Sequence, residues 1–532
     1  MGKTGLAYGK AINRLVSCHP SYSFRVNPCC NMGRALQDGR RFYAVNLSRI
    51  AMASFTSQVS QVCFVWASRF LITCVVLLTG CAMISSPNGM KKPQSAMADM
   101  PPIVFVHGNG DTAALWQTTL WRFESNGWPR SRLHAIEVPY PLARDEDAKP
   151  QAGRTSTAEH AAYLSAEVDK VLAATGASHV VLFANSRGGY AVRNYIQNGG
   201  GAAKVSHAIL SGVPNHGVWA IKGFREGSEF SGTGAFLTAL NAAKTADGDE
   251  VTGPVKWLTI RSDNNDKFAQ PDGLWIGAKG TPTNVTFAGP ALKGATNAVI
   301  PRLDHRETAF SPAAFLTAYS FIKGIGPQYP AVVPEAVVVL NGKVTGLGVN
   351  SGDAKSGNFV NNLPVPDATV QIFATDGSGA RAGGAVHTKR VGADGQWGPF
   401  TAQQGVAYEF VITAAGYSTT HIYRSPFARS SDVVHLRAER MAEADRANPA
   451  AKAIVTFFRP RGYFDAQRDK MSFDGSTQLP GVPPVGAGIA SSKKLIPQLE
   501  LRSITAEFNG ERVAGQTWPT AENHVVVLEL TY

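Results

Sequence analysis

The chain has 532 residues, and its 51 lysine and arginine residues against 39 acidic residues give a formal net charge of +12 at pH 7. This length is enough for roughly two to four domains. All six cysteines and eight of the net positive charges lie in residues 1–81. The rest of the chain therefore lacks cysteines for disulfides or a thiolate metal site, and it lacks the charge expected of a nucleic-acid-binding surface.

The N-terminal segment, residues 1–81, predicts export. Arg69 precedes an apolar run, Phe70–Leu78, that is too short to span a bilayer and is typical of a secretory signal. The run continues into Leu-Thr-Gly-Cys at 78–81, which resembles the bacterial lipobox. This resemblance implies a lipidated Cys81 that anchors an envelope lipoprotein to the membrane. An ordinary signal that is cleaved nearby, and so a secreted protein, is the alternative.

A flexible tether is expected at 82–100, followed by an α/β region at 101–328. Strand and helix patterns alternate there, which predicts a mostly parallel sheet with helices on both faces. The expected strands are Ile103–Val106, Leu133–Val138, Val180–Ala184, His207–Leu210, Lys256–Ile260 and Asn284–Phe287, and the expected helices are Thr112–Ser125, Ser156–Ala174, Gly189–Gln197 and Pro312–Ile322. Residues 219–252 interrupt the alternation. We predict a lid there, with an ordinary surface excursion as the alternative.

After about residue 330 short strands follow one another without helices, which predicts an all-β, sandwich-like part. Within residues 329–440, the segment Pro364–Phe373, followed by Ala414–Tyr417, resembles the transthyretin-like modules often appended to hydrolases. A charged, helical-looking piece near Ala438–Ala450 marks the boundary of a second β-rich module at 441–532.

The motif with the clearest chemistry is Ala184–Gly189, directly after an apolar strand and before a helical pattern. Ser186 has small residues, Ala184 and Gly188, two positions to either side. A serine in this context is the sequence form of a nucleophile elbow, a turn so tight that larger side chains would clash. We therefore expect Ser186 to be a nucleophile at the mouth of a helix N-terminus.

A serine hydroxyl needs a base to take its proton, and the base needs an orienting acid. Where the serine sits on a nucleophile elbow, the acid follows it along the chain and the histidine comes after the acid. His305 is the only histidine beyond the acid region that lies in the α/β part, and it is the expected base. The acid should follow the strand Lys256–Ser262. Asp266 fits best, because an apolar residue and Pro271 follow it, and Asp263 is the reserve choice.

Two backbone N–H groups are expected to stabilise the oxyanion. One belongs to Arg187, directly after the serine, and the other to Asn109 in the His107–Gly110 loop that follows the first strand. The acid loop lacks the glycine and the distal glutamate of a calcium loop, so we predict no metal and no cofactor.

These pieces together resemble the α/β-hydrolase superfamily, and within it the secreted bacterial lipases and esterases. The layout also resembles archaeal lipases with a C-terminal lipid-binding β-domain. The resemblance implies carboxylic-ester hydrolysis of lipid or other apolar esters through an acyl-enzyme. Two departures are Ala184, where the first glycine of the motif is usual, and the lack of cysteines to brace the lid or acid loop.

Two alternatives remain open at this point. A depolymerase of polyhydroxyalkanoate-type polyesters would use the β modules to hold a polymer surface, and a catalytically inactive envelope binding or adhesion protein would keep the fold alone. Candidates for an apolar acyl pocket are Trp116, Trp121, Phe230, Phe236 and Trp275.

Overall fold

The computed structural model describes residues 100–347, 360–486, 488–498 and 500–532, which all belong to one compact unit. The expected leader, the expected lipidation site Cys81 and residues 82–99 of the expected tether lie outside the described residues. Within the described ranges, no helix combines the length and the hydropathy that a bilayer span requires.

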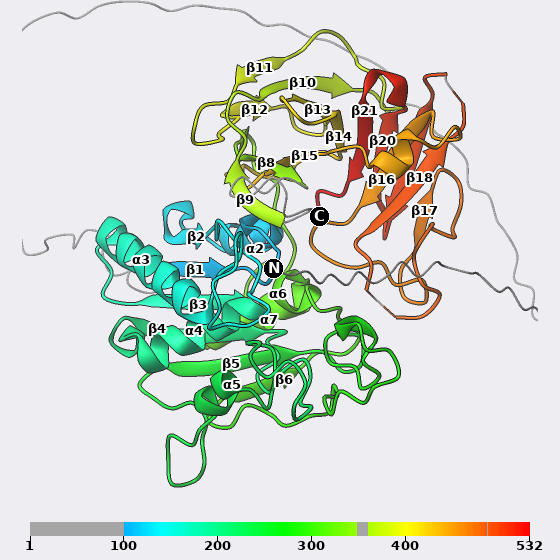
Figure 1. Ribbon diagram of the computed structural model, residues 1–532. Coiled ribbons are helices and arrows are strands. Elements are labelled where there is room, and N and C mark those ends of the chain that lie inside the picture. The colour runs from blue at the N-terminus through cyan, green and yellow to red at the C-terminus, as the bar shows by residue number, and fades with distance from the viewer. Residues whose placement is uncertain (1–99, 348–359, 487, 499) are drawn as a thin grey trace, which may run out of the picture. The chain divides into compact units, whose positions relative to one another are not determined.

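The N-terminal part of this unit is built on a six-stranded parallel sheet with the order β2-β1-β3-β4-β5-β6 (Figure 1). Its strands are β1 (Ile103–Val106), β2 (Leu133–Ala135), β3 (Val180–Asn185), β4 (Val205–Ser211), β5 (Lys256–Arg261) and β6 (Thr296–Val299). The central strands β1 and β3 are buried along their whole length, as expected of parallel strands that helices cover on both faces.

One expected strand is wrong. Asn284–Phe287 is a loop, and the sixth strand is instead β6. This strand lies at the edge of the sheet and pairs only with β5, so most of its residues are exposed. An exposed edge strand needs no continuous apolar run, and its sequence therefore carries little of the signal that marks a buried strand.

Helices cover both faces of the sheet. The helices of this part are α2 (Gln117–Ser125), α3 (Thr157–Thr175), α4 (Arg187–Asn198), α5 (Ala235–Leu240), α6 (Glu307–Phe310) and α7 (Pro312–Lys323), with 3₁₀ turns η1 (Ala113–Trp116), η2 (Arg130–Arg132), η3 (Gly201–Ala203) and η4 (Leu274–Ile276). The short helix α8 (Glu443–Arg446) and the turn η5 (Thr520–Glu522) belong to the C-terminal part. One core joins Leu164 of α3 and Val192 of α4 to Val104, and the other joins Phe123 of α2 and Phe315 of α7 to the opposite face of the sheet. The expected first helix is split into η1 and α2.

Local sequence sets the ends of α3. The Ser156 hydroxyl accepts a hydrogen bond from the Glu159 amide (3.2 Å), and the Glu159 carboxylate accepts one from the Ser156 amide (2.8 Å). This reciprocal capping box satisfies amides that have no partner within the helix. At the other end, Gly176 adopts the left-handed conformation (φ 64°) that closes a helix.

The C-terminal part is almost entirely β structure. Its strands are β7 (Val338–Leu340), β8 (Val344–Leu347), β9 (Val360–Pro364), β10 (Thr369–Thr375), β11 (His387–Arg390), β12 (Phe400–Ala402), β13 (Ala407–Thr413), β14 (Thr419–Arg424), β15 (Leu436–Ala438), β16 (Ala453–Phe458), β17 (Met471–Phe473), β18 (Ser491–Ile496), β19 (Ser503–Phe508), β20 (Glu511–Gln516) and β21 (His524–Glu529). The main sheet has seven strands in the order β11-β10-β13-β14-β21-β16-β18. The other sheets are β12-β7, β15-β8-β9 and β17-β19-β20.

The seven-stranded sheet crosses the boundary predicted between residues 329–440 and 441–532. Strands β14 and β21 pair in parallel, which joins the two expected modules into one sheet. Ile422 and Val527 face one core, whereas Tyr423 and Leu528 face the other. This pairing joins segments about a hundred residues apart, so the local strand pattern that separates the modules cannot reveal it.

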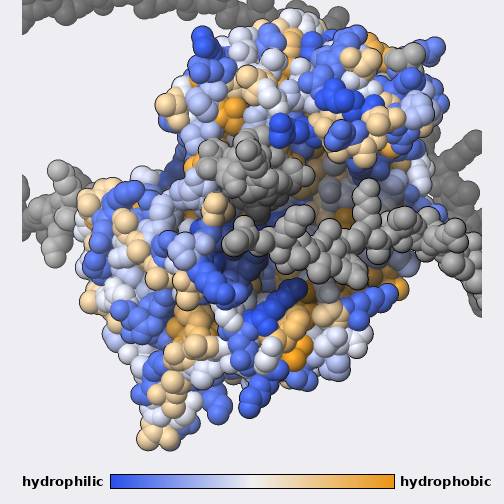
Figure 2. Space-filling model, in the orientation of Figure 1, coloured by the Kyte–Doolittle hydropathy of each residue, from blue (hydrophilic) through white to orange (hydrophobic). Residues whose placement is uncertain are grey.

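On the face of the molecule drawn in Figure 2, hydrophilic side chains are spread over both parts and apolar ones form scattered groups. Apolar groups of this kind are ordinary on a protein surface. Other apolar side chains line a cavity that is described next.

Candidate active site

Ser186 lies in a strained turn between β3 and α4. Its backbone has φ 52° and ψ −128°, a conformation that a non-glycine residue rarely adopts and that is concentrated at functional sites. A Cβ on Gly188 would lie 2.7 Å from the backbone oxygens of Val106 and His107. The small residue predicted at 188 is therefore required, because the helix passes directly against the end of β1.

A second glycine, which the sequence analysis did not single out for this reason, also touches the elbow. A Cβ on Gly108 would lie 2.8 Å from the Cβ of Ser186. The loop after β1 therefore approaches the serine more closely than any side chain at position 108 would allow. The sequence signal was the pair of glycines in the His107–Gly110 loop.

His305 and Asp266 lie together, both buried. The Nδ1 atom of His305 is 2.9 Å from each carboxylate oxygen of Asp266. Asp266 also accepts a hydrogen bond from the Phe268 amide at 2.9 Å, which fixes the carboxylate. With Nδ1–H donating to the carboxylate, the imidazole holds its unprotonated nitrogen, Nε2, toward the other side of the ring.

The reserve acid Asp263 has other partners. Its Oδ1 accepts hydrogen bonds from the backbone amides of Arg302 (2.9 Å) and Asn264 (2.6 Å). Burial raises the pKa of Asp263, but these hydrogen bonds outweigh it and leave that pKa below its ordinary value. Of the two aspartates, only Asp266 contacts the imidazole of His305.

Ser186 and His305 line the same cavity, which has a volume of about 250 Å³. The Nε2 atom of His305 is buried and has no hydrogen-bond partner among the described residues. No hydrogen bond joins it to the Ser186 hydroxyl in the part of the chain that the structure describes. Such bonds are often long without substrate and tighten when it binds.

The two residues expected to supply oxyanion N–H groups lie on either side of the elbow. Asn109 lines the cavity, and its side-chain oxygen accepts a hydrogen bond from the Ala143 amide at 2.8 Å, which anchors the loop after β1. Arg187 is the first residue of α4. The helix N-terminus places backbone N–H groups where negative charge is favourable.

The side chain of Arg187 has a role that the sequence did not predict. It is fully buried and forms a two-pronged ion pair with Glu229, at 2.7 and 2.8 Å. Burial raises the pKa of Glu229, and the guanidinium of Arg187 opposes that rise. Glu229 belongs to the 219–252 excursion, so this segment is tied directly to the residue that follows the nucleophile. The only sequence signal for this ion pair was a glutamate in a stretch rich in Gly, Ser and Phe.

Apolar side chains form much of the cavity wall. Those from the excursion, from the residue just before it and from the acid-loop region are Val218, Trp219, Phe230, Phe268, Trp275 and Ile276. Phe230 and Trp275 are therefore at the cavity as predicted. Trp116, Trp121 and Phe236 are not, because they pack against Phe183, the core of the β part and Tyr190 respectively.

A second cavity of about 330 Å³ also reaches His305 and Asp266. The loop 284–292 forms much of its wall, and Ser186 is not among its lining residues. At its wall, Nε2 of His216 lies 2.8 Å from a carboxylate oxygen of Glu250. This cavity therefore approaches the His305–Asp266 pair without reaching the serine.

Tyr463, which no sequence signal indicated, also lines the cavity that holds Ser186. It comes from the segment between β16 and β17, far along the chain. The ammonium group of Lys267 lies 4.0 Å from the centre of its ring and also faces Phe268 and Trp275. Burial lowers the pKa of Lys267 to about 8.

Two family models match the chain. Residues 100–251 match the lipase (class 2) family, and residues 336–441 match the lipase C-terminal domain. The sequence thus carries both a lipase domain and the C-terminal domain found with lipases.

Solved structures of lipases and esterases are similar to the chain at low identity. The mature lipase BlEst2 of Bacillus licheniformis is 19% identical, with 45% of this chain and 96% of that chain covered and a TM-score of 0.29. The esterase RhEst1 of Rhodococcus sp. ECU1013 is 17% identical, with 43% and 92% covered and a TM-score of 0.26. Aspergillus fumigatus lipase B is 15% identical, with a TM-score of 0.29. The match covers 43% of this chain and 54% of that lipase, so the chain spans only about half the length of that lipase.

The parallel sheet, its helical layers and the two matched families confirm the predicted fold. Two segments of the chain thus match lipase families, the first the class 2 lipases and the second the lipase C-terminal domain.

Proposed function

We propose that Ser186, His305 and Asp266 act as nucleophile, base and orienting acid in the hydrolysis of carboxylic esters with apolar acyl groups. One observation carries the proposal. The imidazole of His305 contacts Asp266 at 2.9 Å through Nδ1, while its unpartnered Nε2 belongs to a residue that lines the same cavity as the strained Ser186. This is the division of roles that an activated serine needs.

In the proposed reaction the Ser186 oxygen attacks the ester carbonyl and its proton passes to Nε2 of His305. The backbone N–H groups of Asn109 and Arg187 hold the oxyanion that forms. The same proton then leaves with the alcohol, and an acyl-enzyme remains. A water molecule, deprotonated by His305, releases the acid and regenerates the serine, while Asp266 stabilises the imidazolium in both halves.

The apolar cavity wall supports an apolar acyl group. Trp219 and Phe230 belong to the 219–252 excursion, and Glu229 ties it to Arg187. These contacts support the interpretation of residues 219–252 as a cover over the site. Burying an apolar chain against such a wall stabilises the complex by about 0.8 kcal/mol per methylene group.

The test is turnover of p-nitrophenyl esters by the full-length protein and by Ser186→Ala, with Ser262→Ala as the matched control. Ser262 is also a buried serine at the end of a sheet strand, but its hydroxyl donates to Asp263. We expect Ser186→Ala to abolish both turnover and labelling by a fluorophosphonate, and Ser262→Ala to keep both. Turnover that survives Ser186→Ala contradicts the proposal, and a wild type without turnover or labelling favours the inactive binding protein.

The acyl preference distinguishes the remaining classes. A series of p-nitrophenyl esters from acetate to palmitate that peaks at long chains indicates a lipase, and a peak at short chains indicates an esterase. Serine-dependent release of soluble acids from an insoluble polyhydroxyalkanoate film, faster than from soluble esters, would instead indicate the polyester depolymerase.

We also propose, from the sequence alone, that the protein is exported and lipidated at Cys81. Metabolic labelling of cells with an alkyne fatty acid tests this. Label is expected on the wild type and on Cys74→Ser, and its loss is expected in Cys81→Ser. Equal labelling of Cys81→Ser and the wild type contradicts the proposal.

A further inference from the structure

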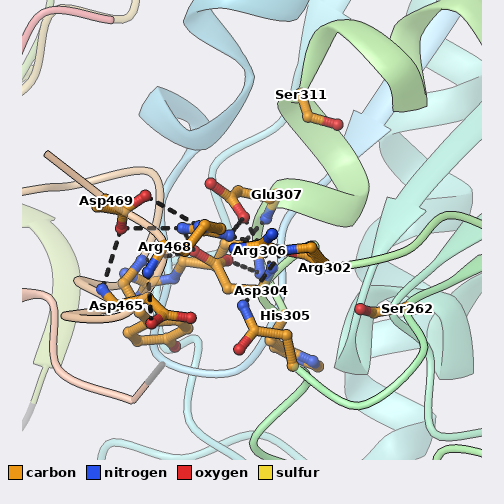
Figure 3. A network of polar contacts seen from close by, with 12 residues as sticks. Ser262, Arg302, Asp304, His305, Arg306, Glu307, Ser311, Asp465, Arg468 and Asp469 are labelled. Atoms are coloured by element: carbon orange, nitrogen blue, oxygen red, sulfur yellow. Dashed lines mark hydrogen bonds and ion pairs between the residues drawn. The ribbon is translucent and has the colours of Figure 1, made fainter. Parts of the chain in front are cut away.

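The chain between β16 and β17 lies against the loop that carries His305. Neither matched family range reaches this segment, since the later one ends at residue 441. Figure 3 shows Arg468 of this segment lying between Asp469 and the loop with Asp304, His305 and Glu307. The residues on either side of the expected catalytic base are thus held by a part of the chain more than 150 residues away.

Arg459 makes the central contacts. Its guanidinium is 2.9 Å from Asp304 and 2.6 Å from Glu307, the residues one before and two after His305. The exposed fraction of the side chain is 5% for Arg459, 0% for Asp304 and 11% for Glu307. At a site as buried as this, water is a poor substitute for a counter-charge, so the two acids depend on Arg459 together with Arg468, which also contacts them.

The two carboxylates shape the backbone around His305. One oxygen of Asp304 accepts hydrogen bonds from the amides of Arg306 (2.8 Å) and Glu307 (2.9 Å), and the other accepts from the amide of Tyr463 (2.7 Å). Glu307 in turn accepts from the Asp304 amide at 2.7 Å. Hydrogen bonds to an ionised carboxylate are about twice as strong as neutral ones, so the turn depends on both acids staying charged.

The ionised form of Asp304 is disfavoured by its surroundings. Burial, followed by the charge of Glu307, raises the pKa of Asp304 to about 6, even though Arg459 acts to lower it. Without Arg459, two buried carboxylates would face each other with Arg468 as the remaining partner. One acid would then take up a proton, or the turn would open.

On the opposite side the turn is held by the elbow itself. The amide group of Asn185, the residue before the nucleophile, donates to the backbone oxygen of His305 at 3.2 Å, and the hydroxyl of Thr308 donates to it at 2.7 Å. The His305 loop is therefore clamped between β3 and the segment after β16.

We infer that Arg459 is a positioning residue for ester hydrolysis, which holds the His305 loop in the geometry where the imidazole meets Asp266 and faces Ser186. The C-terminal β structure is thus a part of the active site, and its residue Tyr463 also lines the cavity that holds Ser186. This inference rests on the proposed function.

The test compares Arg459→Met and Arg459→Lys with Arg461→Met in the full-length protein. Arg461 is a matched control, because it is a fully buried arginine of the same segment whose guanidinium donates to the backbone of Leu530 instead. The readouts are kcat and KM on p-nitrophenyl butyrate, the rate of fluorophosphonate labelling and the melting temperature. Labelling reports the nucleophilicity of Ser186 without requiring turnover.

We expect Arg459→Met to lower kcat and the labelling rate about tenfold to a hundredfold, because small misplacements of a catalytic group cost this much. KM should change far less. Arg459→Lys should recover part of the loss, since it keeps the charge but reaches only one acid. Arg461→Met should keep kcat even where it lowers the melting temperature.

Glu307→Gln keeps the inference open to refutation if Arg459→Met does not fold. It removes one of the two acids that Arg459 serves, and it too should lower kcat more than KM. Arg459→Lys and Glu307→Gln enzymes with wild-type kcat would overturn the inference, as would equal losses of kcat in Arg459→Met and Arg461→Met. Turnover that persists in Ser186→Ala would instead refute the proposed function itself.

Discussion

Replacing Asp266 by asparagine tests the proposed triad most directly. The carboxylate lies 2.9 Å from Nδ1 of His305 and would stabilise the imidazolium that forms as Ser186 loses its proton. At an effective dielectric constant of about 20, two unit charges at this distance attract by about 6 kcal/mol. Since about 1.4 kcal/mol corresponds to a tenfold change in rate, Asp266→Asn should lower kcat by about 10⁴-fold. The new amide also donates toward Nδ1 and favours the wrong tautomer, which acts in the same direction.

The assay is kcat for a soluble p-nitrophenyl ester, with Ser186→Ala as the background. Asp263→Asn is the control, because Asp263 lies in the same loop but accepts hydrogen bonds from Arg302 and Asn264. It should change the barrier by less than about 1.4 kcal/mol, or tenfold in rate. An Asp263→Asn variant that loses more activity than Asp266→Asn would show that the acid has been assigned incorrectly.

Three further predictions concern stability. Gly188→Ala should destabilise the fold by about 1–3 kcal/mol, because the new Cβ would overlap two backbone oxygens. Gly326→Ala is the control and should not destabilise it, because nothing lies within 4 Å of a Cβ there. Equal melting temperatures of the two variants would contradict the prediction. Glu229→Gln should lower the free energy of unfolding by about 3–5 kcal/mol, because it leaves the buried Arg187 without its counter-charge. Denaturant unfolding measures this change, and an unchanged midpoint would refute the prediction. Burial, followed by the charge of Arg187, holds the pKa of His160 well below 6.5, so protonation below that pH favours the unfolded chain. At pH 5.5 the free energy of unfolding of the wild type should therefore be about 1.4 kcal/mol lower than well above pH 6.5. A His160→Gln variant should not show this loss, and equal losses in the two proteins would contradict the prediction.

Much of the fold could be predicted from the sequence because its strongest signals are local. A parallel strand that is covered on both faces must be a continuous apolar run, and β1 and β3 are such runs. The capping residue Ser156 and the closing Gly176 mark the ends of α3 in the same local way. The edge strand β6 could not be predicted, because it is mostly exposed and little constrains its composition.

The elbow is also a local feature, since the sterics of one tight turn require small residues at 184 and 188 and place Ser186 between them. The choice of Asp266 over Asp263 is not local. Only two residues lie between them in the same loop, and the path of that loop past His305 decides which carboxylate meets the imidazole.

By itself, the sequence determined the α/β alternation and singled out Ser186, His305 and the two competing aspartates as the proposed catalytic residues, because each depends on the residue types within one strand, turn or loop. Tertiary structure alone decided which acid meets the base, that Glu229 pairs with Arg187, and that Arg459 holds the His305 loop. Arg459 and Asp304 stand 155 residues apart, and their ion pair exists only because the segment after β16 is folded against the loop before α6. Burial makes such a pair necessary, and burial is a property of the folded chain.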